Sequence, residues 1–354
     1  MPEDKPIIVA AEQLKRFEAE AFERAGLTPD NAVRVADTLL QADLRGVHSH
    51  GALHLLRYCR RLRGGGANPR PNIKVVRETD STALVDGDNG LGQMVSMRTM
   101  EVAMAKAKGK GIAAVAAFRS NHYGAGAYYP MMAAAQGFIA YGTTNAPAML
   151  APTGGLTPML GNNPVTYAIP AGKEPMIVLD MALSVAARGK IRVAAGKGVK
   201  IPKEWATDKY GEPTDDPVAA LEGLLLPVGG YKGYGMIVVG EILCGIMTGA
   251  NFGPAINVTL DNSDTPWNIG HFFTAIDVEA FMGRDEFNKR VDDLVKLLKD
   301  VPKAKGYDRI YLPGEPEHIL TQERLKGGIP LQASTIEDLK TVAKEFGVKA
   351  PLPG

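Results

Sequence analysis

The chain has 354 residues, of which 45% are hydrophobic and 22% are charged, and its net charge at pH 7 is +1. These totals are typical of a globular protein of about two or three lobes and give no reason to expect nucleic-acid or membrane binding. The two cysteines cannot form a disulfide framework, and the N-terminal residues lack a signal-peptide core, so we expect a cytoplasmic protein.

The chain begins with predicted helices. The first covers residues 11–25, and the second begins at Thr28-Pro29, because a capping residue followed by proline is typical of a helix start. A third predicted helix follows His50 and ends at the glycines of residues 64–66. It carries several arginines, which we expect to form a solvated face: Arg57, Arg60, Arg61 and Arg63.

From residue 73 onwards, strand-like and helix-like stretches alternate, which predicts an α/β fold. The expected strands cover residues 73–76, 82–85, 112–118, 138–143, 165–169, 176–179 and 272–276. The expected helices cover residues 94–107, 124–136, 233–249 and 278–298, and residues 207–217 are expected to be a loop. Ser334 and Glu337 have capping-box spacing before a last helix.

Histidines are the most informative residues of this chain. Three of the six lie close together, at His48, His50 and His54, and His122 follows a predicted buried strand. Histidine suits proton transfer near neutral pH, and ligands of open α/β sheets gather at the carboxyl ends of strands. Gly51 lets a ligand approach the backbone beside His50. His50 and His122 are therefore both candidates for an acid–base residue.

The same three histidines could instead form a metal site. Such sites usually add carboxylate or thiolate ligands, and the triplet has none at helical spacing. We therefore predict no metal, and a metal-dependent lyase built on His48, His50 and His54 is a distant alternative.

A dinucleotide cofactor needs a phosphate- and ribose-binding surface. The GxGxxG fingerprint is missing, and the looser match at residues 109–114 precedes a strand instead of following one. Polar groups follow other predicted strands, at Thr144, Asn145 and Asp180, although Asp180 is equally typical of a helix N-cap. Lys232 lies in a glycine-rich turn before an apolar helix, where it suits an anionic group.

Taken together, several segments resemble the type 2 malate/L-lactate dehydrogenase family. They are ADLRGVHSHG (42–51), NPRPNIKVV (68–76), SNHYGAGAYY (120–129), GNNPVTYAIP (161–170), VLDMALSVAARGKI (178–191), IPKEWATDKYGEPTDDP (201–217), GGYKGYGM (229–236) and LPGE (312–315). The resemblance implies a non-Rossmann three-layer α/β fold with a seven-stranded mixed sheet. It also implies a homodimer that transfers hydride reversibly between NAD or NADP and a small 2-hydroxy or 2-keto acid.

The resemblance implies roles for individual residues. His50 or His122 would be the acid–base, with Ser49 hydrogen-bonded to His50. The implied cofactor-binding residues are Thr144, Asn145, Asp180, Met181, Ala182, Lys232, Gly314 and Glu315. An added phosphate of NADP would need a basic partner, and Arg188, Lys190 and Arg192 are equally available.

The substrate-binding residues show one departure from the family. Members commonly carry an arginine four residues after the SHG histidine, and this chain has His54 there. A neutral imidazole is a poor replacement for a guanidinium that binds a carboxylate, so Arg45 and Arg57 join His54 as candidates. The departure keeps open a reductase of cyclic imino acids such as Δ1-piperideine-2-carboxylate. We expect a helical lobe over residues 1–75 and 290–354, and a central cofactor-binding domain over residues 76–289.

Overall fold

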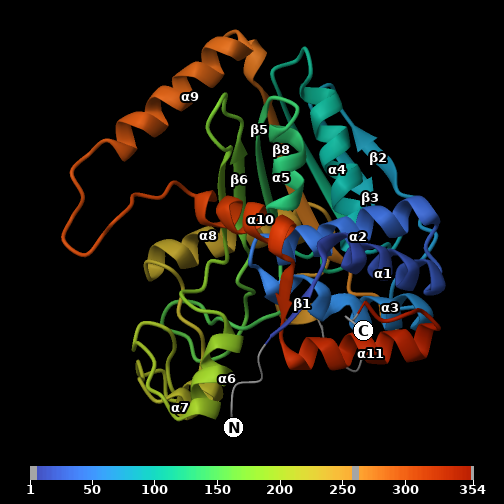
Figure 1. Ribbon diagram of the computed structural model, residues 1–354, viewed down its shortest axis with the longest axis vertical. Coiled ribbons are helices and arrows are strands. Elements are labelled where there is room, and N and C mark those ends of the chain that lie inside the picture. Colours follow the sequence, from blue (N-terminus) through green and yellow to red (C-terminus); the bar gives the residue numbers. More distant parts are fainter. Residues whose placement is uncertain (1–5, 257–262, 352–354) are drawn as a thin grey trace.

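The computed structural model describes residues 6–256 and 263–351. The fold is built around a seven-stranded sheet with the strand order β2-β3-β4-β8-β5-β6-β7 (Figure 1). Strands β3 and β4 are parallel and the other neighbours are antiparallel, which confirms the predicted mixed sheet. The strands are β2 (Lys74–Glu78), β3 (Thr82–Asp86), β4 (Ile112–Ser120), β5 (Phe138–Thr144), β6 (Val165–Ile169), β7 (Ile177–Met181) and β8 (Ile269–Asp277).

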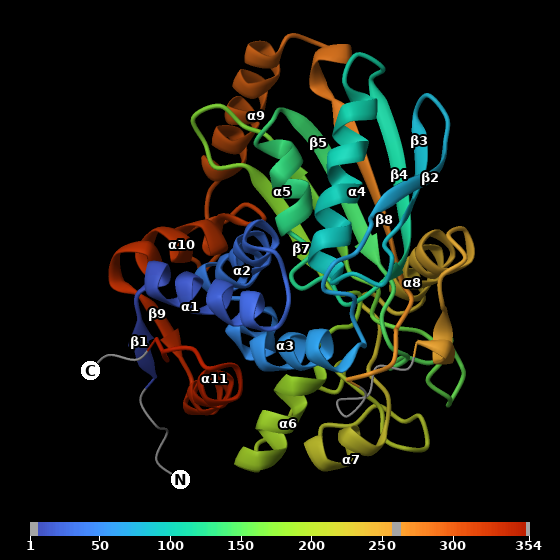
Figure 2. The same cartoon turned by 90° about the vertical axis from the view of Figure 1, so that its right-hand side faces the viewer.

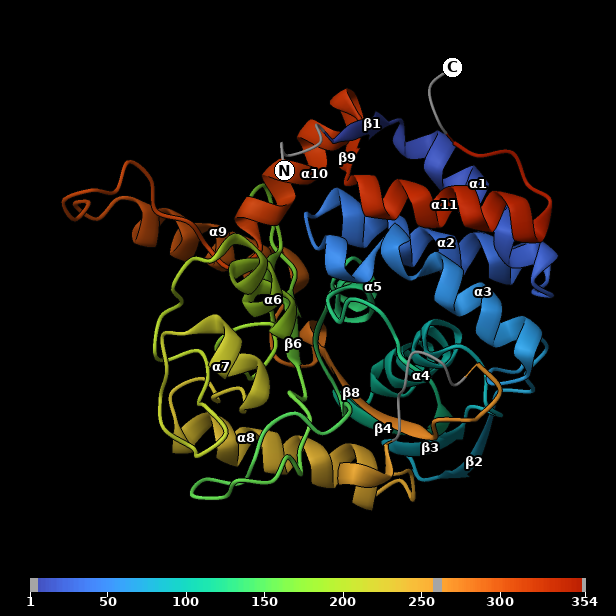
Figure 3. The same cartoon turned by 90° about the horizontal axis from the view of Figure 1, so that it is seen from below.

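Helices cover both faces of this sheet. Helix α4 (Gly92–Ala107) and helix α5 (Tyr128–Ala134) pack on one face, and α8 (Tyr231–Glu241) lies on the other (Figure 3). The inner side of α4 is rich in methionine and valine, and these side chains form one buried cluster with alternate residues of the central strands. The arrangement confirms the three layers that the sequence predicts. Within the described residues, no helix is both long enough and apolar enough to span a membrane.

The two ends of the chain meet in a helical lobe (Figure 2). Strand β1 (Ile7–Val9) pairs with β9 (Ile329–Leu331), and one buried cluster unites residues from Val9 to Met94 with residues from Ile329 to Val348. The helices are α1 (Ala11–Arg24), α2 (Pro29–Leu44), α3 (Leu55–Gly64), α10 (Glu315–Gly327) and α11 (Ala333–Phe346). Thr28 caps α2 as expected, because its hydroxyl accepts a hydrogen bond from the backbone N–H of Asn31. The division into two domains stays a proposal.

Several predicted elements have other boundaries. The expected helix over residues 278–298 begins later, as α9 (Arg284–Lys299), because a 3-10 turn at 278–280 is capped by Asp277. The expected helix over residues 124–136 shortens to α5, since residues 124–127 form a loop. The expected helix over residues 233–249 divides into α8 and a π-helix at 242–246.

Other differences concern helix starts. The predicted capping box is wrong: Gln332 is the N-cap of α11, its side chain makes no capping hydrogen bond, and Ser334 lies inside the first turn. Helix α6 (Arg188–Lys197) was not predicted, because its two glycines weaken the helical signal. Helix α7 (Pro217–Glu222) begins where the expected loop ends, with the Asp216 side chain as its cap.

Candidate active site

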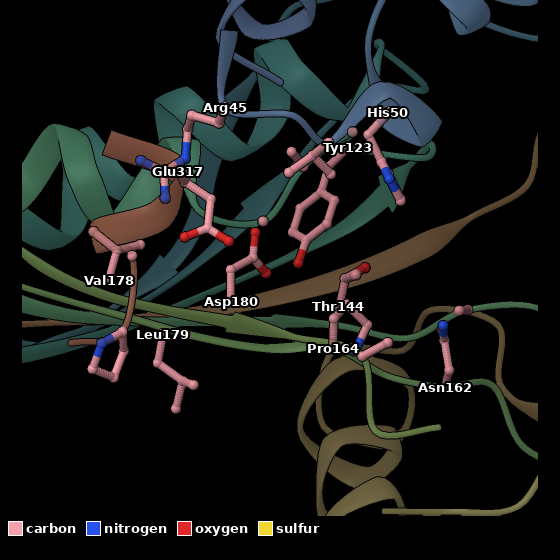
Figure 4. Close-up of a pocket in the computed structure, with 18 of the residues that line it drawn as sticks. Arg45, His50, Tyr123, Thr144, Asn162, Pro164, Val178, Leu179, Asp180 and Glu317 are labelled. Carbon is pink, nitrogen blue, oxygen red and sulfur yellow. The ribbon is translucent and has the colours of Figure 1, made fainter. Parts of the chain in front are cut away.

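A cavity of about 590 Å³ lies where the helical lobe meets the sheet (Figure 4). The loops that follow β4 and β5, strand β7, the segment before α10 and the end of α2 all contribute to its wall. Most of the predicted site residues line this cavity: Arg45, His50, His122, Thr144, Asn145, Asp180, Ala182 and Gly314. The structure thus brings together side chains from segments far apart in the sequence.

A short turn after α2 positions His50. The carboxylate of Asp43 accepts a hydrogen bond from the backbone N–H of Ala52 at 2.7 Å, and it lies 2.7 Å from Nδ1 of His48. The hydroxyl of Ser49 lies 2.9 Å from Nδ1 of His50. His48 therefore serves the turn through Asp43, while Ser49 contacts His50 as the family resemblance implies.

The imidazole rings of His50, His54 and His122 form a cluster. Their centroids lie 5.6 Å apart for His50 and His122, 5.2 Å for His54 and His122, and 5.9 Å for His50 and His54. Burial lowers the pKa of His50 and His122, and it lowers the pKa of His54 to about 3. The rings are therefore neutral near pH 7. Protonation of one ring also makes protonation of its neighbours less favourable, because two positive charges would lie close together.

This arrangement does not support the metal alternative. Nδ1 of His48 is paired with the carboxylate of Asp43. Across residues 6–256 and 263–351, no group of three histidine, cysteine or acidic side chains is placed to hold a metal ion.

Polar groups line the part of the cavity over the sheet. The carboxylate of Asp180 accepts hydrogen bonds from the backbone N–H of Ala127 at 2.9 Å and from the hydroxyl of Thr166 at 3.0 Å. The hydroxyl of Thr144 lies 2.8 Å from Nδ1 of the buried His271 and donates to the carbonyl oxygen of Gly270. Asp180 and Thr144 are thus held rigidly by their neighbours before any ligand binds.

The same wall has unused hydrogen-bonding capacity. Among residues 6–256 and 263–351, the buried Tyr123 hydroxyl has no hydrogen-bond partner, and its ring stacks on His271 with centroids 5.1 Å apart. In Figure 4 this hydroxyl points between Asp180 and Thr144. Gly126 completes a close cradle, since a Cβ there would lie 2.9 Å from the Tyr123 oxygen. Hydroxyl, carboxylate and amide groups of this kind fit the ribose and carboxamide of a nicotinamide cofactor.

The remaining predicted residues do not line the cavity. The His54 ring contacts the ring of His122, and Arg57 places its guanidinium over the Trp267 ring, 4.7 Å from the centroid. Met181 is the last residue of β7, directly after Asp180. Lys232 is exposed at the start of α8, and Glu315 forms ion pairs with Lys299 and Arg309. Their proposed roles stay predictions.

The site also contains residues that were not singled out from the sequence, and three of them carry polar groups near the predicted ones. Tyr123 lies in the wall, Tyr58 contacts His122, and Glu317 approaches Arg45 (Figure 4). Tyr123 stands inside the SNHYG segment, so the motif itself is a signal for it. Tyr58 follows His54 by one helical turn, which is a weaker signal.

A family model described as malate/L-lactate dehydrogenase matches residues 9–340. The chain belongs to the malate/L-lactate dehydrogenase family. It is 39% identical to the malate dehydrogenase of Pyrococcus horikoshii, covering 97% of this chain and 96% of that one. It is 32% identical to the ureidoglycolate dehydrogenase (NAD(+)) of Escherichia coli, covering 91% of this chain and 92% of that one.

The fold agrees with a solved structure of the same family. Sulfolactate dehydrogenase from Methanocaldococcus jannaschii has a TM-score of 0.92 to this chain at 38% identity, covering 97% of this chain and 98% of that one. The predictions of the family, the fold class and a dehydrogenase are therefore confirmed.

Proposed function

We propose that this protein transfers hydride reversibly between NAD or NADP and the C2 carbon of a small 2-hydroxy or 2-keto acid. The observation that carries the proposal is one cavity that is lined both by two neutral histidines and by a preorganised polar wall. Relatives named for malate, sulfolactate and ureidoglycolate support the substrate class. Names that include NAD(+) and NADP(+) support the cofactor class.

When bound, the nicotinamide cofactor supplies or accepts the hydride. Asp180, Thr144 and Tyr123 would hold it, because their oxygen atoms line one wall and the buried Tyr123 hydroxyl has no partner in the described part of the chain. His50 or His122 transfers the proton at the substrate oxygen, giving it during reduction and taking it during oxidation. A neutral histidine suits the base, and its low pKa makes the protonated form a strong acid.

We propose Arg45 as the residue that binds the substrate carboxylate. Arg45 is 8% exposed and lines the cavity, with Glu317 and Asp180 near its guanidinium (Figure 4). Burial lowers the pKa of Arg45, and these two carboxylates oppose that shift, so the side chain keeps its charge. His54 is neutral and Arg57 is stacked on Trp267, which leaves Arg45 best placed for an anion.

An absorbance assay at the nicotinamide band tests this function. NADH and NADPH are offered in parallel with 2-keto acids, sulfopyruvate and cyclic imino acids. Turnover of a 2-keto acid supports the proposal and identifies the cofactor. Turnover of imino acids alone would show that the substrate is a cyclic imino acid and not a 2-keto acid. A protein that neither turns over any of these compounds nor binds the cofactor would overturn the proposal.

We further propose a homodimer in the cytoplasm. Apolar side chains spaced three or four residues apart on α8 and the following π-helix are each about half exposed: Met236, Val239, Ile242 and Ile246. A row of this kind is typical of a protein interface. Cys59 and Cys244 are both buried free thiols, which supports a reducing compartment.

A further inference from the structure

Tyr58 and His122 form a buried hydrogen bond behind the cavity. The Tyr58 hydroxyl on α3 lies 2.6 Å from Nδ1 of His122, and Tyr58 is 1% exposed. Burial raises the pKa of the phenol, so the oxygen keeps its proton. His54 stacks on the Tyr58 ring at 5.4 Å and holds it against the cluster.

The direction of this hydrogen bond follows from the surroundings. If Nδ1 of His122 donated, the buried phenol proton would need a second acceptor. Burial raises the pKa of the phenol and a hydrogen bond from the Gln93 side chain lowers it, so the phenol oxygen accepts the amide N–H of Gln93. The phenol proton is then left for His122, whose Nδ1 lies 2.6 Å away. A buried donor without a partner costs about 1–3 kcal/mol. Tyr58 therefore donates to Nδ1.

A hydrogen bond to Nδ1 fixes the tautomer of His122. The neutral ring then carries its proton on Nε2, so that nitrogen is a donor and has no lone pair to accept a proton. A positive charge on His122 is opposed by burial and by the neighbouring His54, His50 and Arg57. His122 is consequently suited to donating a hydrogen bond to a substrate oxygen and poorly suited to being the base.

His50 differs in this respect. Its Nδ1 faces the Ser49 hydroxyl, which can donate or accept, so both states of Nε2 keep a satisfied hydrogen bond. We propose that Tyr58 is a positioning residue that holds His122 as a neutral Nε2–H donor, leaving proton transfer to His50. The proposal rests on the proposed function for its catalytic meaning. During reduction the imidazolium form of His50 gives its Nε2 proton to the carbonyl oxygen as hydride reaches the carbonyl carbon, which leaves a neutral ring with its proton on Nδ1. During oxidation this neutral ring takes the hydroxyl proton at Nε2 as hydride leaves the same carbon.

Nitrogen NMR of the ligand-free protein labelled with ¹⁵N-histidine tests the tautomer. The signals of His122 are assigned by their loss in His122→Asn. We expect a protonated Nε2 and an unprotonated Nδ1 at pH 7.5, and a shift toward a tautomer mixture in Tyr58→Phe. Tyr129→Phe is the matched control, because the Tyr129 hydroxyl is buried and donates to the backbone carbonyl of Tyr123. It should leave the His122 signals unchanged.

A protonated Nδ1 in the wild-type protein would overturn the proposal, as would unchanged His122 signals in Tyr58→Phe. The wild-type measurement holds even if Tyr58→Phe folds poorly, and it needs neither substrate nor turnover. The NMR experiment can therefore contradict the proposed His122 tautomer without contradicting the proposed function, which the absorbance assay tests separately.

Kinetics then test the division of roles. We expect Tyr58→Phe to lower kcat about tenfold with a smaller change in KM. The ionisation limb of the pH–rate profile should vanish in His50→Ala and persist in His122→Ala at a reduced rate. The reverse pattern would assign proton transfer to His122 and contradict the proposal.

Discussion

The carboxylate of Asp43 occupies the space that a side chain at position 51 would need. A Cβ on Gly51 would lie 2.2 Å from Cγ and Oδ2 of Asp43, a distance that real Cβ contacts do not reach. The same carboxylate binds the backbone N–H of Ala52 and faces His48. The buried Asp43 side chain thus fixes helix α2 to the turn that bears His50, and we call this contact the Asp43 lock. It requires glycine at position 51, because a larger side chain would collide with the carboxylate.

Gly51→Ala should consequently impair catalysis strongly, although it adds only one methyl group. The added methyl group must displace Asp43 or shift the turn, and a displacement of about 1 Å at a catalytic group can cost about 100-fold in rate. We expect kcat/KM to fall at least tenfold and the thermal midpoint to decrease. Gly189→Ala is the matched control, because a Cβ there meets nothing within 4 Å. Equal activity of the two variants would contradict the Asp43 lock.

The histidine cluster should make the protein sensitive to mild acid. His54 binds a proton near pH 6.5 in the unfolded chain and at about 3 in the folded protein. As the pH falls below 6.5, the unfolded state gains this proton first, so stability is lost progressively down to about pH 3. At pH 5 the expected loss from His54 is at most about 2 kcal/mol.

Denaturant unfolding of His54→Asn at pH 7 and pH 5 measures this contribution. The difference in unfolding free energy between the two pH values should be smaller than in the wild-type protein by up to about 2 kcal/mol. An identical difference in both proteins would show that His54 is not held neutral by the fold.

Asp180 should contribute directly to cofactor affinity. Its carboxylate is already oriented by Ala127 and Thr166, so it can accept charge-assisted hydrogen bonds without reorganisation. We expect Asp180→Asn to raise the Kd of the nicotinamide cofactor about tenfold, which corresponds to about 1.4 kcal/mol. Titration calorimetry measures the change, with Asp80→Asn in the exposed turn between β2 and β3 as the control. Wild-type affinity in a folded Asp180→Asn protein would remove Asp180 from the cofactor site.

The sequence predicts those parts of the fold whose signals are local. The sheet strands contain short apolar runs, and Thr28-Pro29 marks a helix start, so both signals agree with the structure. Arg61 shows the opposite case. The predicted solvated face is wrong for this residue, which is 2% exposed and stacks on Trp267 at 3.5 Å. Its hydrogen-bond partners Asn121 and Thr265 lie 60 and 204 residues away in the chain, so no local pattern indicates them.

The candidate site divides in the same way. The family motifs predict that His50, His122 and Asp180 belong together, and the cavity contains all three. The contact between Tyr58 and His122 joins residues 64 positions apart and depends on how α3 packs against the loop after β4. Helical periodicity cannot predict such a contact, because it describes one element at a time.

The exposed apolar row on α8 leads to a prediction about assembly. Replacing Val239, which is 55% exposed, by glutamate places a charge in the middle of the proposed interface. Burying an unpaired charge costs several kcal/mol, so Val239→Glu should shift the protein from dimer to monomer in light scattering coupled to size-exclusion chromatography. Val33→Glu is the matched control, since Val33 is 47% exposed on α2, outside that row. A dimer that persists in Val239→Glu would show that the two copies do not meet at this face. A monomeric wild-type protein would show that a second copy of the chain does not cover it.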